Sequence, residues 1–472
     1  MGSVCAIYKP GKNCVFNLLR ATQRLQHLGQ EWSGIAVSNG SSINYVVKPG
    51  TIREGFPLNK IANRIGDDYV PKENYEGSAG IGCTSVAEKQ PMCLHANFGQ
   101  FALAFDGRVL NLKELKDWLK DKGHVFYRGN ETEVLMKLIA QGTDVVEGIK
   151  IMNEKVRGSY SIAILQNGCV YVVRDPRGVN PLQIGEGNGN FIAVSETDAL
   201  NRTGSKFIRD MKPGEIIRLS EKGIETVGQL PAQQKAFCAF RWFYTARVDA
   251  ILEGISSDLV RKKIGAWHFD QDAKEGIKLD MIAGMPMSGT SYALGYSEAS
   301  IDSKDTSKIV PFNEAFLYDR YSGRSYIPPT QEERNIVADQ KVSIMANTVK
   351  GKVVGLTDDS IVRGTVMMYK IHLLKEAGAK EVHVRIGYPM LKDICLLNIS
   401  TKEKDELAIY KFKDLEGIRK HIGADSLRYT PIDIAVDMLN ESAITPRVKL
   451  TKDDLCLFCT NSVDPIETPE NR

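Results

Sequence analysis

The chain has 472 residues, of which 43% are hydrophobic and 25% are charged, and this predicts a soluble globular protein with two or more domains. Its 61 basic and 58 acidic residues leave a net charge of +3, which argues against nucleic acid or an anionic membrane as a partner. No apolar run is long enough for a membrane helix, and Lys9 and Pro10 interrupt a would-be signal peptide. We therefore expect a cytoplasmic protein.

The first half of the chain alternates between helical and strand-like patterns. Leu18, Ala21, Leu25 and Leu28 mark one helix, which Gly29 would end. Two layers of antiparallel strands between two helical layers would accommodate this alternation. Further helices are expected at residues 112–122 and 132–141, and strands at residues 34–37, 80–86, 101–105, 159–164, 170–173, 191–194 and 215–219.

The glycine-rich run at residues 185–189 stands between two predicted strands and not before a helix. This position indicates a hairpin tip, because a phosphate-binding loop would lead into a helix.

A βαβ unit is predicted in the second half of the chain. Residues 353–356 form a short apolar run typical of a buried strand, and residues 381–386 form a second strand. Met367, Ile371 and Leu374 follow the spacing of a helix between them.

Two carboxylates precede the loop that enters this helix. Asp358 and Asp359 would lie at the carboxyl end of the first strand, where they could hold ribose hydroxyls or a hydrated Mg²⁺. The loop would leave backbone N–H groups at the positive end of the helix dipole, which suits a phosphate. A second interpretation needs no ligand, because Asp358, Asp359 and Ser360 could simply cap the helix.

The string D-D-S-I-V-R-G-T at residues 358–365 resembles the phosphoribosyl pyrophosphate (PRPP) motif of type I phosphoribosyltransferases, in the form found in the amidophosphoribosyltransferase family. In the first half, residues 25–30 (L-Q-H-L-G-Q) and 174–182 (R-D-P-R-G-V-N-P-L) resemble segments of class II glutamine amidotransferases. The resemblance covers nearly the whole chain. It implies an N-terminal-nucleophile αββα sandwich at residues 1–235, followed at residues 236–472 by a type I phosphoribosyltransferase-like domain with a parallel sheet.

The resemblance also implies a PRPP and nucleotide site. Residues 284–291 are similar to the pyrophosphate loop and residues 318–328 to a mobile lid, although alone they would be an ordinary turn and a surface loop. Met287, Tyr318 and Asp339 replace an acidic residue, a Lys and an Arg of the family pattern. The implied residues are Ser288, Gly289, Thr290 and Ser291 for pyrophosphate, Arg320 and Arg324 in the lid, Asp358 and Asp359 for ribose and Mg²⁺, and Ser360, Ile361, Val362, Arg363, Gly364 and Thr365 for the 5′-phosphate.

The glutaminase chemistry of the first half is expected to be lost. The family nucleophile is the Cys of a C-G-I motif, whose nearest counterpart is Cys5 in C-A-I, behind a four-residue leader. C-T-S-V at residues 83–86 replaces H-V-R-Y, so the Arg that grips the glutamine carboxylate is missing. F-D-G-R at residues 105–108 replaces H-N-G-N, so Asp106 would place negative charge in the oxyanion hole. Glu131 replaces the Asp that holds the amino group.

Nine cysteines are scattered along the chain, which suits reduced thiols or a metal site better than disulfides. The C-x-x-C at residues 456–459 leaves zinc, redox chemistry and chance open. The resemblance implies a [4Fe–4S] cluster that ties the C-terminal tail to both domains, with zinc as the alternative metal. The ligands would be Cys238, Cys395, Cys456 and Cys459.

Two functions agree with these features. The first is an enzyme of de novo purine biosynthesis that forms 5-phosphoribosylamine from PRPP with ammonia or glutamine. The second is a pseudoenzyme, a paralogue that binds PRPP or nucleotide and regulates or assembles with an active relative. The expected partners are PRPP and purine nucleotides, and the chain is expected to form a homodimer or homotetramer.

Overall fold

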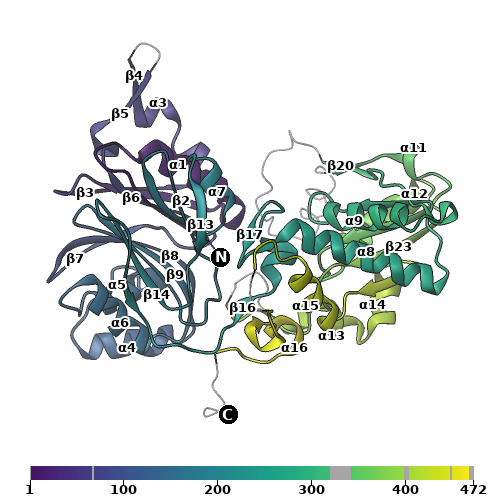
Figure 1. Ribbon diagram of the computed structural model, residues 1–472. Coiled ribbons are helices and arrows are strands. Elements are labelled where there is room, and N and C mark those ends of the chain that lie inside the picture. The colour runs from purple at the N-terminus through teal and green to yellow at the C-terminus, as the bar shows by residue number, and fades with distance from the viewer. Residues whose placement is uncertain (1, 66–67, 319–341, 398–402, 447–448, 467–472) are drawn as a thin grey trace.

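The middle strand of a seven-stranded antiparallel sheet is β1 (Gly2–Tyr8), in the first of two bodies that lie side by side (Figure 1). The computed structural model describes residues 2–65, 68–318, 342–397, 403–446 and 449–466. Across this sheet the order is β13 (Lys206–Asp210), β11 (Gln183–Gly187), β12 (Asn190–Val194), β1, β6 (Ala79–Ser85), β2 (Trp32–Ser38) and β3 (Ile43–Pro49).

A six-stranded antiparallel sheet faces the first one. Its order is β15 (Gly223–Gln229), β14 (Glu215–Ser220), β10 (Cys169–Arg174), β9 (Gly158–Gln166), β8 (Gly99–Val109) and β7 (Met92–Ala96). Side chains alternate across β1, so that Val4 and Ala6 enter the core between the sheets, together with Ala104 and Leu165. Cys5 and Ile7 point the other way, into the apolar layer that includes α1 (Val15–Arg24).

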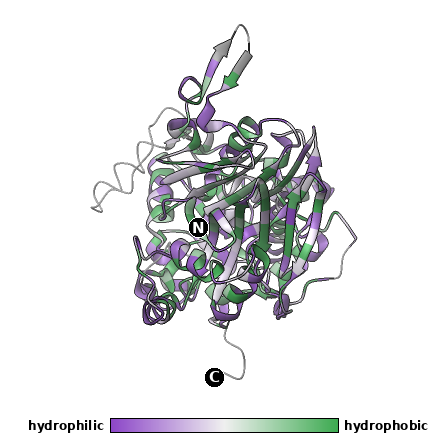
Figure 2. Cartoon of the chain, turned by 90° about the vertical axis from the view of Figure 1, so that its left-hand side faces the viewer, coloured by the Kyte–Doolittle hydropathy of each residue, from purple (hydrophilic) through white to green (hydrophobic). Residues whose placement is uncertain are grey.

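The outer face of the six-stranded sheet is covered by α4 (Leu112–Asp121), α5 (Glu131–Ile139) and α6 (Val145–Lys155). Apolar residues line the interior strands in Figure 2, and the hairpin of β4 (Ala62–Ile65) and β5 (Asp68–Pro71) projects beyond the sheets. The layers are therefore helix, sheet, sheet and helix. The remaining elements of this body are η1 (Gln26–Leu28), α2 (Ile52–Gly55), α3 (Leu58–Ile61), η2 (Glu73–Tyr75) and α7 (Asp198–Asn201).

The second body is built on a four-stranded parallel sheet. Its order is β19 (Met281–Gly284), β22 (Val353–Asp358), β23 (Glu381–Ile386) and β24 (Ser426–Tyr429). One face packs against α12 (Thr365–Glu376) and α14 (Leu415–Ile422). Phe269 of α8 (Ser257–Glu275) and Tyr296 of α9 (Thr290–Asp302) belong with Ile282 of β19 to a separate apolar cluster. The parallel strands are thus buried, as their apolar sequences require.

Short elements complete the second body. Where the chain enters it, β16 (Phe237–Cys238) pairs in parallel with β25 (Leu455–Cys456) of the C-terminal tail, so that Cys238 stands opposite Cys456. The other elements are η3 (Arg241–Thr245), β17 (Ile251–Leu252), β18 (Ile255–Ser256), η4 (Thr306–Lys308), β20 (Phe316–Tyr318), β21 (Val342–Ile344), α11 (Ala346–Val349), η5 (Lys404–Glu406), α13 (Ala408–Phe412), α15 (Ile432–Glu441), η6 (Lys452–Asp454) and α16 (Phe458–Asn461).

These layers confirm the fold class expected from the sequence. The predicted βαβ unit corresponds to β22, α12 and β23, and the glycine-rich run at residues 185–189 is the tip of the β11–β12 hairpin. Among the helices in the described ranges, none is both long and apolar enough to cross a membrane.

Candidate active site

Two loops at the carboxyl edge of the parallel sheet are joined by hydrogen bonds. The Ser288 hydroxyl donates to Asp358 Oδ1 at 2.6 Å, and the Thr357 hydroxyl donates to the Gly289 carbonyl at 2.8 Å. A Cβ atom on Gly289 would lie 2.1 Å from the Thr357 carbonyl oxygen, so this close approach requires glycine. The structure therefore brings the predicted pyrophosphate loop and the predicted PRPP motif together at one edge.

The two carboxylates of the motif are adjacent and shielded from water. Asp359 is 4% exposed, its backbone N–H donates to Asp358 Oδ1 at 2.9 Å, and its Oδ2 accepts the Ser360 hydroxyl at 2.5 Å. Burial raises the pKa of Asp358, and burial together with the Asp358 charge raises the pKa of Asp359 well above its usual range. Such a pair favours a bound cation, because positive charge offsets both the desolvation and the mutual repulsion.

The carboxylates do not cap α12, so the capping interpretation is wrong. The N-cap of this helix is Gly364, in the left-handed region at φ 85° and without a side-chain cap. Arg363 is exposed and forms an ion pair with Glu406, and Ile361 is buried in the apolar core. Ile361 can therefore offer a ligand its backbone alone.

The remaining residues predicted for this site lie at the start of α9 or beyond the described ranges. Thr290 begins α9, and the buried Ser291 donates its hydroxyl to Asp258 Oδ1 at 2.8 Å. The lid residues Arg320 and Arg324 lie outside the residues that the structure describes.

Cys5 is badly placed for the nucleophilic role that the motif suggested. It is fully buried in the middle of β1 on the side of α1, and burial raises the pKa of its thiol far above the usual range. The end of β1 that reaches the first-half pocket is Gly2, whose backbone N–H donates to Asp106 Oδ1 at 2.8 Å. Cys5 therefore does not line this pocket, and Gly2, which reaches its edge, has no nucleophilic side chain.

A cavity of about 140 Å³ marks the first-half pocket, between the ends of β6 and β8 and the start of α5. Arg108 and Glu131 both line it, with Arg108 Nη1 3.0 Å from Glu131 Oε1. Burial raises the pKa of Glu131 to about 7, an effect that Arg108 opposes and Glu88 reinforces. Arg108 and Glu131 therefore form an ion pair inside this pocket.

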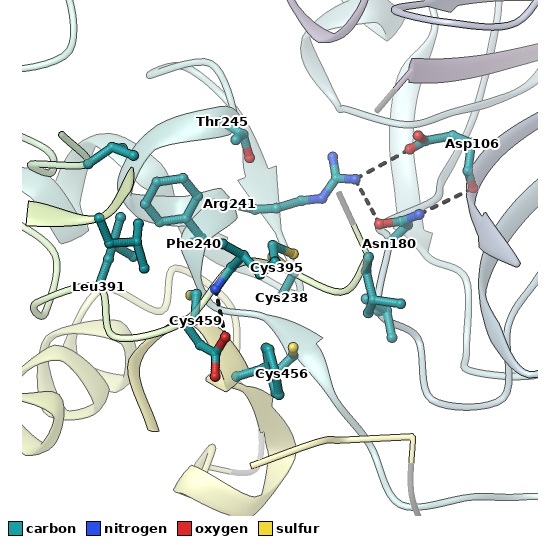
Figure 3. A pocket seen from close by; sticks show the side chains of 17 residues that line it. Asp106, Asn180, Cys238, Phe240, Arg241, Thr245, Leu391, Cys395, Cys456 and Cys459 are labelled. Carbon is teal, nitrogen blue, oxygen red and sulfur yellow. Dashed lines mark hydrogen bonds and ion pairs between the residues drawn. The ribbon is translucent and has the colours of Figure 1, made fainter. Parts of the chain in front are cut away.

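Four cysteines from three distant segments line one cavity of about 110 Å³ between the two bodies (Figure 3). They are Cys238, Cys395, Cys456 and Cys459. Burial is the main cause that raises the thiol pKa of Cys456 and Cys459, and the charges of the other cysteines add to it. In the described ranges, no three His, Cys, Asp or Glu side chains are close enough together to hold one metal ion.

The same cavity is also lined by Arg241, which the sequence patterns did not single out, together with residues of both bodies. Arg241 Nη2 donates to Asn180 Oδ1 at 2.8 Å and lies 3.3 Å from Asp106 Oδ2, and Asn180 Nδ2 donates to the Asp106 carbonyl at 3.2 Å. Val362 of the PRPP motif also lines it. No local motif marks Arg241, because only the contact between the two bodies brings it to Asp106.

Comparisons with known proteins agree over almost the full length. The family described as "Glutamine amidotransferase domain" matches residues 79–202. The amidophosphoribosyltransferase of Methanocaldococcus jannaschii is 34% identical over 94% of this chain and 93% of its own, and that of Bacillus subtilis is 32% identical over 87% and 83%. The solved structure of B. subtilis glutamine PRPP amidotransferase, complexed with ADP and GMP, superimposes with a TM-score of 0.86 at 28% identity over 98% of this chain and 97% of that one. The chain therefore belongs to the amidophosphoribosyltransferase family.

Proposed function

We propose that this protein transfers ammonia to PRPP as an enzyme of purine biosynthesis and that its first half does not hydrolyse glutamine. The ammonia lone pair forms a bond to C1 of the ribose, the bond from C1 to the pyrophosphate oxygen breaks, and a proton is released. The products are 5-phosphoribosylamine and pyrophosphate. One observation carries the proposal: the Ser288–Asp358 hydrogen bond joins the two loops that such a substrate must bridge.

Each loop has a task in this reaction. Backbone N–H groups around Gly364, at the positive end of the α12 dipole, bind the 5′-phosphate. Asp358 and Asp359 hold the ribose hydroxyls and the Mg²⁺ that accompanies the diphosphate. Ser288 and its neighbours Gly289 and Thr290 receive the pyrophosphate. Magnesium supplies positive charge to the leaving group when it is bound.

Three features of the first-half pocket support the loss of glutamine hydrolysis. Gly2 occupies the strand end beside the pocket and offers no thiol. Asp106 brings a carboxylate to the place where an oxyanion needs donors, and one lost donor alone costs about 3–4 kcal/mol of transition-state stabilisation. Arg108 forms an ion pair with Glu131, and this pair competes with the substrate amino group that Glu131 would otherwise bind.

The proposal includes a [4Fe–4S] cluster in the cysteine cavity. Zinc bound by the same four thiolates is the alternative metal. Four thiolates are the ligands that such a cluster requires, and four thiols line this cavity. Cys238, Cys395, Cys456 and Cys459 would be the ligands.

We also propose that the chain divides after residue 235 and forms a homo-oligomer that binds purine nucleotides. The division is supported by the pairing of β16, which begins at Phe237, with β25 of the tail, whereas β15 still belongs to the first body. The homologous B. subtilis structure complexed with ADP and GMP supports the nucleotide proposal.

The test measures pyrophosphate release from PRPP with Mg²⁺ and ammonium salts. The wild type should release pyrophosphate, and replacing both Asp358 and Asp359 by Asn should lower the rate at least 100-fold. Glu76→Gln, an exposed carboxylate in the first body, is the matched control and should leave the rate unchanged. Wild-type protein that binds PRPP without releasing pyrophosphate would favour the regulatory paralogue instead.

A further inference from the structure

A buried arginine stands between the cysteine cavity and the first-half pocket. Arg241 is 5% exposed, and Figure 3 shows its side chain reaching across the cavity toward Asp106 and Asn180. Its Nη2 contacts both of those residues, at 3.3 and 2.8 Å. Its Nη1 is fully buried and has no hydrogen-bond partner in the part of the chain that the structure describes. A buried guanidinium N–H left unpaired is costly, so Arg241 lacks one acceptor.

Arg241 supplies the positive charge of the cavity lining. Among the described residues that line it, Arg241 is the one Lys or Arg. The second carboxylate of the lining, Asp393, already has a cation, because Lys404 Nζ lies 2.6 Å from its Oδ2. The only carboxylate with which Arg241 forms an ion pair in the described ranges is Asp106, at the longer distance of 3.3 Å.

We propose that Arg241 is the counter-cation of the iron–sulfur cluster and divides its charge between the cluster and Asp106. The inference rests on the cluster of the proposed function, which is anionic because four thiolates bind it. Net charge and nearby hydrogen-bond donors set the reduction potential of such clusters. Arg241 is then a positioning residue that couples the cysteine cavity to the first-half pocket, and coupling of this kind acts in both directions.

The alternative is a plain ion pair that holds the two bodies together. Both roles predict that loss of Arg241 destabilises the fold, because it leaves Asp106 buried without its cation. They differ in their effect on the cluster, because a purely structural pair has no reason to shift its potential in a charge-dependent direction.

The experiment is a redox titration, followed by optical and electron paramagnetic resonance spectra, of anaerobically purified protein whose iron content has been measured. Arg241→Met should move the midpoint potential to more negative values, because the reduced cluster loses a nearby positive charge. Asp106→Asn should move it to more positive values, because Arg241 is no longer neutralised. The midpoint potential of Arg241→Lys should lie between those of Arg241→Met and the wild type.

The matched control is Arg261→Met. Arg261 is also buried, but it does not line the cavity. Its guanidinium donates to the carbonyls of Trp242, Tyr244 and Ala246. The potential of this variant should equal that of the wild type. Unchanged potentials in both Arg241→Met and Asp106→Asn would overturn the assignment of Arg241 while leaving the cluster in place. Iron-free wild-type protein would overturn the cluster and the assignment together. Should Arg241→Met fail to fold, the direction in which Asp106→Asn shifts the midpoint potential tests the assignment of Arg241 instead: a positive shift supports it and a negative or absent shift contradicts it.

Discussion

Charged side chains in the first-half pocket already have partners within the protein. The Asp106 carboxylate accepts a hydrogen bond from the backbone N–H of Gly2 and forms an ion pair with Arg241, so both of its oxygens have partners within the protein. Arg108 and Glu131 pair with each other inside the cavity. Each of these charged groups is therefore paired without a substrate, as the proposed loss of glutamine hydrolysis requires.

Glu131 gives this pocket a measurable pH dependence. Its pKa is raised from 4.5 to about 7 by burial, so between these values the folded protein holds a proton that the unfolded chain has released. The free energy of unfolding should therefore fall as the pH rises from 5 to 8, by up to about 3 kcal/mol. Glu131→Gln, which mimics the protonated form, should remove this fall in denaturant titrations. A variant that loses stability in parallel with the wild type would show that Glu131 is not the titrating group.

Gly289 tests the close approach of the two site loops. Gly289→Ala places a methyl group 2.1 Å from the Thr357 carbonyl oxygen, so the loops must separate and the Ser288–Asp358 bond must lengthen. PRPP affinity, measured by calorimetry, should fall at least tenfold. Gly351→Ala is the control, because its Cβ meets no atom within 4 Å and only backbone strain at φ 74° remains. Equal affinities in the two variants would contradict the role given to Gly289.

Among the elements, the start of α12 decides whether the PRPP motif can bind phosphate. The helix has a glycine N-cap in the left-handed region and no capping side chain, so its first N–H groups remain available to a ligand. A helix that is capped by its own side chain would have used one of these donors. The local geometry therefore agrees with a binding site more than with a merely structural turn.

Gly364→Ala tests this helix start. The left-handed conformation at φ 85° costs an alanine about 1 kcal/mol of stability, and the new Cβ lies 3.3 Å from the His421 ring. The loop should shift and lower the affinity for ribose 5-phosphate compounds such as AMP or PRPP. Gly423→Ala carries the same strain at φ 74°, after α14. It should lose similar stability in thermal melts yet bind normally, and weak binding by both variants would contradict a local role for Gly364.

Much of this organisation could be predicted from the sequence, because it rests on local patterns. The β22–α12–β23 unit and the β11–β12 hairpin follow from hydrophobic spacing and glycine positions. The buried position of Cys5 could not be predicted, because a three-residue motif does not fix which strand residue lies beside the pocket. Arg241 was missed because its partners, Asp106 and Asn180, are 135 and 61 residues away in the chain.

On the scale of the whole molecule, the cysteine cavity lies between the two candidate sites. Asp106 of the first-half pocket and Val362 of the PRPP motif both line it. The tail reaches the same region, because β25 pairs with β16 and Lys392 and Asp393 donate backbone N–H groups to the Cys459 carbonyl. Replacing Cys238 and Cys456 should therefore loosen the contact between the two bodies as well as the tail.

The nitrogen source of the product tests the central claim most directly. The protein would receive PRPP, Mg²⁺, glutamine labelled with ¹⁵N in its amide and unlabelled ammonium, and product nitrogen and free glutamate would be measured together. We predict unlabelled 5-phosphoribosylamine formed at the rate of pyrophosphate release, with no glutamate above the level of a protein-free sample. Labelled product accompanied by equimolar glutamate would show that the first half still hydrolyses glutamine and would contradict the account.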